Sequence, residues 1–204
     1  DNKREPVKLN GLSNIVKVDA YKYITTALDS NGNLYAWGEG YGNTPEKIYE
    51  NILDMSENVL ITSDRRIMRL DGSLIHNLRN VVKISSDGTT ILAILDNGQA
   101  VSIDTSENIT NLSITNGVDV SCGNEFGYIQ TASRELYTYG TNTYGQLGNG
   151  NTNNVAAPTK VAASDVERIS AGEGDHGAYT TFDGSIYTTG LNDKGQLGHK
   201  NIDN

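Results

Sequence analysis

The sequence predicts an all-β fold made of about five short repeats, and three observations lead to this prediction. The pattern Tyr-x-x-Gly-x-Asn-x-x-Gly-Gln-Leu-Gly begins at Tyr137 and again at Tyr187, and a period of a few tens of residues indicates stacked or radial repeats. Asp183-Gly184 lies between two β-rich runs, which is the strongest short-range signal of a hairpin. No stretch carries apolar residues at helical spacing over three turns, so we expect few helices.

Each repeat reads as a short strand, a loop, a second strand, a tight turn and a third strand. The last unit shows this order most clearly, with strands predicted over 166–172, 177–182 and 185–190. The same order is predicted for units that begin near residues 15, 52, 81 and 117, the second of which is worn. A fourth, outer strand is predicted for the first four units, over 46–49, 73–76, 111–114 and 159–161.

Four short strands in about forty residues suit one blade of a β-propeller. We therefore expect residues 1–204 to form a single domain, a propeller of about five short four-stranded blades or a partial array from a larger propeller. The segment 7–11 resembles the missing outer strand of the last unit. If this segment paired with the last unit, it would close the ring and cover an edge strand that would otherwise be open to pairing with other chains. The alternative is that both ends belong to a longer array.

Composition excludes several classes of function. A net charge of −9 argues against a nucleic-acid partner, because phosphate-backbone binding needs clustered Lys and Arg. The negative charge is explained either by solubility or by attraction of a partner protein that carries a basic patch. No apolar run approaches the roughly 18 residues of a membrane span, so we expect no membrane insertion. One cysteine, Cys122, and three scattered histidines predict no disulfide and no metal site, and we expect no cofactor.

The repeated residues resemble the repeat of the regulator of chromosome condensation family. The resemblance lies in Val166–Gly172, Asp175-His176, Asp183–Gly190 and Gly195–Gly198, and it recurs without the histidine in Val118–Gly123 and Leu136–Gly148. It implies a β-propeller with repeats around a central channel. The family includes nucleotide-exchange factors, histone and DNA binders, ubiquitin-ligase modules and bacterial secreted inhibitors, and fold alone does not choose among them.

The most regular motifs are interpreted as structural, and we predict no catalytic residue. The Gly-Gln-Leu-Gly stretches supply turns, and Leu147 and Leu197 are expected to fill the space between neighbouring blades. His176 stands at the structural histidine position that the resemblance implies. No nucleophile elbow, zinc-protease motif or phosphate-binding loop occurs in the sequence.

The loops that follow the first strand of each unit are expected to gather on one face. Aromatic side chains rimmed by charge are typical binding anchors, so we predict a partner-binding face from Tyr21, Tyr23, Glu57, Asp87, Glu125, Phe126, Glu173 and Asp175. The favoured function is a non-enzymatic protein-interaction module. The alternatives are an exchange factor for a small GTPase and a secreted inhibitor or cell-surface adhesin. Residue usage rich in Asn, Ile and Tyr favours a bacterial member, and an extracellular or cell-surface location is favoured over the cytoplasm.

Overall fold

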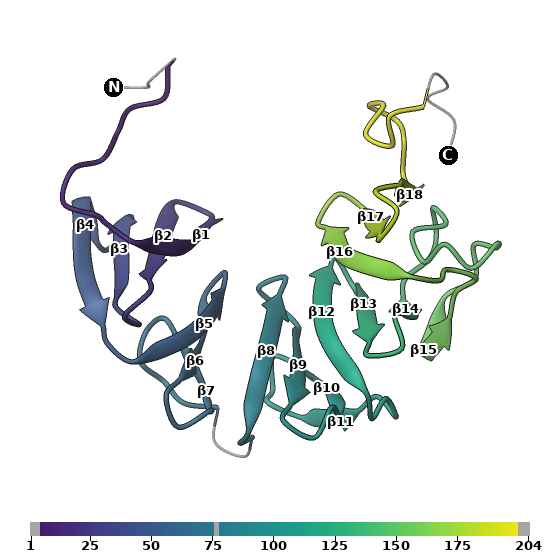
Figure 1. The fold of residues 1–204 in the computed structure, drawn as a ribbon, viewed down its shortest axis with the longest axis horizontal. Helices are drawn as coiled ribbons and strands as arrows, with labels where there is room; N and C mark the ends of the chain where they lie inside the picture. The colour runs from purple at the N-terminus through teal and green to yellow at the C-terminus, as the bar shows by residue number, and fades with distance from the viewer. Residues whose placement is uncertain (1–4, 76–77, 200–204) are drawn as a thin grey trace.

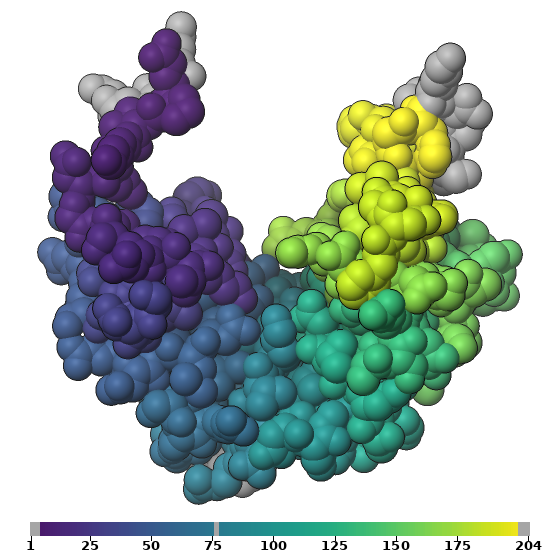
Figure 2. Space-filling view, in the orientation of Figure 1, coloured from purple at the N-terminus to yellow at the C-terminus, as the bar shows by residue number. Residues whose placement is uncertain are grey.

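Five antiparallel sheets follow one another along the chain as the blades of an open arc. The computed structural model describes residues 5–75 and 78–199, and these contain no helix. The first strand of each sheet lies nearest the centre, and an opening separates the first sheet from the fifth (Figure 1). The space-filling view shows this opening as a hollow between the purple and yellow ends (Figure 2). The predicted all-β propeller is confirmed, in the form of a partial array.

In each sheet the strands pair in the order in which they occur in the chain. Blades one, three and four have four strands, whereas blades two and five have three within the described residues. The strands are β1 (Ile15–Tyr21), β2 (Ile24–Asp29), β3 (Leu34–Gly38) and β4 (Gly42–Tyr49); β5 (Ile52–Ser56), β6 (Val59–Thr62) and β7 (Ile67–Arg69); β8 (Val81–Ser86), β9 (Ile91–Leu95), β10 (Ala100–Ile103) and β11 (Ile109–Asn111); β12 (Gly117–Gly123), β13 (Phe126–Thr131), β14 (Leu136–Gly140) and β15 (Val155–Lys160); and β16 (Val166–Gly172), β17 (His176–Thr181) and β18 (Ile186–Gly190).

The outer strands differ most from the sequence prediction. In blade three, β11 ends at Asn111, the first residue of the predicted 111–114 strand. Leu112 and Ile114 do not extend the strand, because they are buried in the core between blades three and four. In blade two, an isolated bridge between Met68 and Leu74 stands where the 73–76 strand was predicted. Residue 76 lies outside the described residues.

The predicted closure of the ring by the segment 7–11 is wrong. Residues 5–14 contain no strand, and the sheet of blade five consists of β16, β17 and β18. The N-terminal segment leaves blade one on the far side of the opening from β18 (Figure 1), so its backbone cannot pair with the edge of blade five. Val7 remains 63% exposed as a consequence.

The inner strands share one irregularity, which shows that the repeats are in structural register. We number each inner strand from position one at its first residue. In every blade the pairing slips between positions one and three, so that position two is the extra residue of a β-bulge. In four blades this residue is apolar and exposed: Val16, Leu53, Val82 and Val118. A regular alternation of buried and exposed side chains does not predict this exposure, because the bulge changes which face of the sheet the following side chains lie on.

The core is divided among the seams between neighbouring blades. Four clusters of buried side chains join blades one and two, two and three, three and four, and four and five. Leu147, which is 1% exposed, packs in the last cluster with Val161 and Val166. The carbonyl of Gln146 accepts hydrogen bonds from Tyr128 of its own blade and from Thr189 of the next. Gly-Gln-Leu-Gly therefore fastens blade four to blade five.

Candidate functional site

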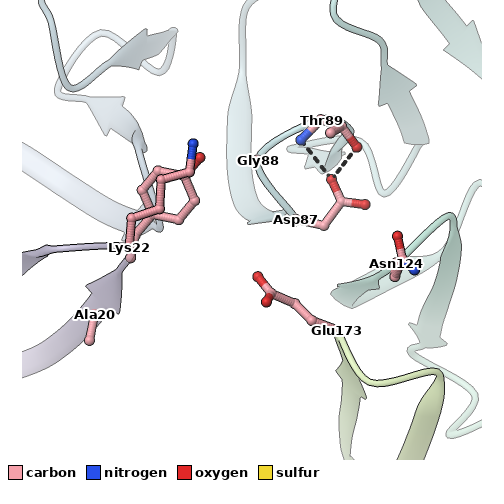
Figure 3. Close-up of a pocket in the computed structure, with 8 residues that line it drawn as sticks. Ala20, Lys22, Asp87, Gly88, Thr89, Asn124 and Glu173 are labelled. Atoms are coloured by element: carbon pink, nitrogen blue, oxygen red, sulfur yellow. Dashed lines mark hydrogen bonds between the residues drawn. The ribbon is translucent and has the colours of Figure 1, made fainter.

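The connections between the first and second strands converge near the centre of the arc. They line a cavity of about 500 Å³, to which four blades contribute side chains (Figure 3). We call it the turn cavity. Its lining residues are Ala20, Tyr21, Lys22, Asp87, Gly88, Thr89, Asn124 and Glu173. The fifth contribution comes from blade two: a Cβ placed on Gly88 would lie 2.9 Å from Tyr21 Oη and 3.4 Å from Glu57 Oε2.

The backbone of these tight connections sets the direction of the side chains. A residue in the left-handed region occurs in each connection, and in four blades it is not glycine: Lys22 (φ 51°), Glu57 (φ 51°), Glu125 (φ 58°) and Asp175 (φ 56°). This conformation costs an L-residue about 1–2 kcal/mol. In blade three Gly88 takes the role, with φ 82°. Any side chain there would meet Tyr21 and Glu57, so the glycine keeps the cavity open.

Asp87 is held in position by its own turn. Its Oδ1 accepts hydrogen bonds from the amides of Thr89 (2.8 Å) and Thr90 (2.7 Å) and from the Thr89 hydroxyl (2.8 Å). These are the bonds of an Asx-type turn. These bonds fix the Asp87 carboxylate, and Figure 3 shows Asp87 and Glu173 approaching from different blades.

Glu57 is the electrostatic centre of the site. Its amide donates to Asp19 Oδ2 at 2.8 Å, which ties blade two to blade one. Its Oε2 is buried and has no hydrogen-bond partner among the described residues. Burial, as the largest cause, and the negative charges of Glu173, Asp19 and Asp87 together raise the pKa of Glu57 to about 8. The carboxyl is therefore mostly protonated at neutral pH.

The turn cavity carries more negative than positive groups. Carboxyl groups of Glu57, Asp87 and Glu173 come from three different blades. One lysine, Lys22, lies at the rim, where its ammonium is 4.9 Å from the centroid of the Tyr21 ring. Such a contact is a weak cation–π interaction. These acidic side chains suit the binding of a cationic group, such as a lysine or arginine side chain, that enters the cavity from solvent.

The structure brings together only part of the predicted face. Tyr21, Asp87 and Glu173 line the turn cavity, and Glu57 adjoins it. Tyr23 is 78% exposed. Glu125 Oε2 accepts from the Thr141 hydroxyl of its own blade at 3.3 Å. Asp175 Oδ1 accepts at 3.4 Å from Asn124 of blade four, which lines the cavity, so Asp175 adjoins the cavity through this residue.

The prediction of Phe126 as a surface anchor is wrong. Phe126 is 3% exposed and packs edge-on against Tyr128, with ring centroids 5.7 Å apart. It begins β13, and its side chain points into the seam with blade five. The connection in blade four is one residue shorter than the pattern suggested, so the aromatic belongs to the strand and not to the loop.

Sequence reasoning missed Asp19 and Ala20, which belong to the inner strand. Asp19 stands at position five, where the other blades have serine at Ser56, Ser85, Ser121 and Ser170. A repeat alignment by position would have marked this acid as the exception.

Two further reactive side chains, Cys122 and His176, make contacts within the fold. Cys122 is buried, and burial raises the pKa of its thiol. His176 Nδ1 lies 3.3 Å from the Gly174 carbonyl within its own turn. Across residues 5–75 and 78–199, no group of three or more His, Cys, Asp or Glu side chains is arranged to hold a metal ion. The same residues include no helix long and apolar enough to cross a membrane.

Comparison with known proteins supports the resemblance seen in the repeats. The regulator of chromosome condensation (RCC1) repeat matches residues 135–176. Protein pim1 of Schizosaccharomyces pombe is 25% identical over 182 residues, which cover 78% of this chain and 33% of that protein. The human X-linked retinitis pigmentosa GTPase regulator is 39% identical over 52 residues, 26% of this chain and 5% of that protein.

Solved structures agree on the fold. Prp20p from Saccharomyces cerevisiae, described together with its binding properties to Gsp1p and histones, superposes with a TM-score of 0.80 at 17% identity. The match covers 93% of this chain and 61% of that one. The chain thus spans about a third of the length of Pim1 and about six tenths of Prp20p. Residues 135–176 thus match the RCC1 repeat, and the fold of the chain is similar to that of Prp20p.

Proposed function

We propose that the chain is a non-catalytic protein-interaction module that binds a basic surface of a partner protein at the turn cavity. The observation that carries the proposal is the meeting of three carboxyl groups, on Glu57, Asp87 and Glu173, around a cavity of about 500 Å³. Fixed opposite charges raise association rates and select the partner more than they add affinity. A lysine or arginine side chain that entered the cavity would ionise Glu57 and pair with it.

Support comes also from the surface around the cavity. Tyr23, which follows Lys22 in the sequence, is 78% exposed and offers an aromatic ring to a partner. Exposed tyrosines next to a charged centre are common anchors of protein interfaces. The similar propeller Prp20p is described with binding properties to proteins, namely Gsp1p and histones. A protein-binding role for this chain is consistent with that description.

The proposal is tested by calorimetry with a ten-residue oligolysine peptide, at low and physiological salt. The test variant combines Glu57→Gln, Asp87→Asn and Glu173→Gln. The matched control combines Glu46→Gln and Glu167→Gln at exposed sites away from the cavity. It removes two negative charges, as the test variant does at neutral pH, where Glu57 is mostly protonated. We expect the test variant to lose at least about tenfold in affinity and the control to lose much less.

Equal losses in the two variants would contradict the proposal, because they would show that net charge and not the cavity attracts the peptide. Binding that is insensitive to salt would contradict it as well. The rival exchange-factor role predicts a different result, namely faster release of labelled nucleotide from a small GTPase. If such accelerated release were observed, the exchange-factor role would be supported and the non-catalytic proposal would be wrong.

A further inference from the structure

The connection between β8 and β9 is the longest of the five that join a first strand to a second. The last pair across these two strands is Ser86 with Ile91, which leaves residues 87–90 in the connection. The corresponding last pairs leave two residues in blades one, two and four, and three residues in blade five. The longer connection offers more surface, and cavities lie on more than one side of it.

A second cavity lies where this connection meets blade four. Its volume is about 220 Å³, and an apolar cavity of about 150 Å³ already takes a benzene-sized group. We call it the seam cavity, because blades three and four both line it. Its lining residues are Asp87 and Thr90 from blade three, and Cys122, Glu125, Phe126 and Tyr139 from blade four.

The walls of the seam cavity favour an apolar occupant. Cys122 and Phe126 are 7% and 3% exposed, and Tyr139 packs against the buried cluster that joins blades three and four. The Cys122 thiol donates to the Thr90 carbonyl at 3.7 Å, and the Asp87 amide donates to the same carbonyl at 3.3 Å. The thiol and this carbonyl thus bond within the protein. A polar side chain that entered the cavity would lose water for few new hydrogen bonds, which is costly.

Asp87 connects the seam cavity to the turn cavity, because it lines both. Its Oδ1 accepts from the amides of Thr89 and Thr90, so the carboxyl is fixed between the two cavities. The other charged residue of the seam cavity, Glu125, is acidic and exposed. A chain segment that leads from one cavity to the other therefore passes carboxyl groups and then reaches an apolar recess.

The cavity on the opposite side of the connection has a different chemistry. It has a volume of about 320 Å³ and lies at the border of blades two and three. Arg69, Asp104 and Glu107 line it, and Arg69 Nη2 lies 3.7 Å from Glu107 Oε1. An apolar side chain placed there would remove water from charged groups without pairing them. Of these two neighbours of the turn cavity, the seam cavity is the one that suits an apolar group.

We propose that the partner protein places a lysine or arginine in the turn cavity and, within two residues of it, a leucine, isoleucine, valine or methionine in the seam cavity. The inference rests on the proposed function and deepens it by naming the partner segment, which combines basic and apolar side chains. The short spacing follows because the cavities share Asp87 and one residue spans at most about 3.6 Å. Carboxyl groups attract the basic residue, whereas burial of the apolar side chain adds affinity that salt does not screen.

The test compares two nine-residue peptides by calorimetry at physiological salt. Both have lysine at eight positions, and the central residue is leucine in one peptide and serine in the other, so their charges are equal. We expect the leucine peptide to bind the natural protein at least about fivefold more tightly, because its apolar side chain is buried on binding. Thr90→Leu, which fills the seam cavity, should remove this preference and leave the affinity for the serine peptide unchanged. Thr105→Leu, the same change in the cavity between blades two and three, should keep the preference.

A second measurement uses the natural protein and therefore does not depend on the folding of a variant. Cys122 is the one cysteine of the chain, and it lines the seam cavity. At saturating concentrations, the leucine peptide should slow the reaction of this thiol with methyl methanethiosulfonate at least about threefold more than the serine peptide does, because its side chain blocks access.

Equal affinities of the two peptides for the natural protein, or equal rates of Cys122 modification, would overturn the inference. A leucine preference that survives Thr90→Leu and disappears in Thr105→Leu would overturn it too, since the apolar side chain would then occupy the cavity between blades two and three. Failure of the proposed function gives a different result. In that case the combined variant Glu57→Gln, Asp87→Asn and Glu173→Gln would bind the serine peptide as tightly as the natural protein does, whatever the preference for leucine.

Discussion

Replacing Glu57 by Gln should make the protein more stable at alkaline pH and leave its stability at pH 4 almost unchanged. Burial and neighbouring acids raise the pKa of Glu57 from 4.5 to about 8 in the folded protein. Between these two values the folded protein keeps a proton that the unfolded chain has lost. Stability therefore falls as pH rises through this window, and the loss is complete above the folded pKa. The Gln variant cannot ionise and escapes the loss.

The size of the effect follows from the shift and from the exposure of the group. At about 1.4 kcal/mol per pKa unit, the full shift corresponds to about 5 kcal/mol. Glu57 as a whole residue is half-buried although its Oε2 is buried. Solvent also screens the neighbouring charges, so we expect about 1–2 kcal/mol. The gain of Glu57→Gln over the natural protein should appear between pH 5 and 9.

The assay is urea unfolding followed by circular dichroism at several pH values. The matched control is Glu125→Gln, which changes an exposed acid in the same left-handed position of blade four (φ 58°). This control shows what the loss of an exposed carboxyl from a left-handed position contributes by itself. A Glu57→Gln curve parallel to that of the natural protein would refute the reasoning, because it would show that the buried Oε2 ionises without cost.

Two pairs of substitutions test the packing between blades and the backbone geometry of blade four. Leu147→Ala should lower the free energy of unfolding in urea by about 2–4 kcal/mol, because it leaves a cavity in the seam between blades four and five. Leu197→Ala, at the half-buried equivalent position, should lower it clearly less. Equal losses would contradict the assignment of Leu147 to this seam. Gly140→Ala should destabilise the protein more than Gly145→Ala, because its Cβ would lie 2.3 Å from the Glu125 carbonyl oxygen. A Cβ on Gly145 meets nothing within 4 Å, so Gly145→Ala should cost only the about 1–2 kcal/mol of backbone strain at its φ of 79°. Thermal unfolding ranks the pair, and the reverse order would contradict the local geometry.

Local signals predicted most of the strands because each depends on a few neighbouring residues. Asp183-Gly184 specifies a hairpin through the positive φ of Gly184, 84° in the structure. The fourth strands were harder, because an outer strand has one neighbour and little burial to mark it. Leu112 and Ile114 look like strand residues, yet they serve the core between blades.

Long-range features could not be predicted in the same way. Closure of the ring depends on the angle between blades, which no sequence pattern encodes, and the segment 7–11 was assigned wrongly for that reason. The position of Phe126 depends on the length of one turn. The pairing of Glu57 with Asp19, and its place beside Gly88, needs three blades in space. Charge composition indicated an acidic surface, but only the arc brings Asp87 and Glu173 to one cavity.

Proton release on binding tests the central claim most directly. Titration of the ten-residue oligolysine peptide at pH 7, in two buffers of different ionisation enthalpy, measures the protons released per bound peptide. If a lysine ammonium enters the turn cavity, Glu57 ionises, and about one proton should be released; Glu57→Gln should abolish the release. Peptide binding without proton release, and with the same affinity in the Glu57→Gln variant, would contradict the claim that the turn cavity is the site of partner binding.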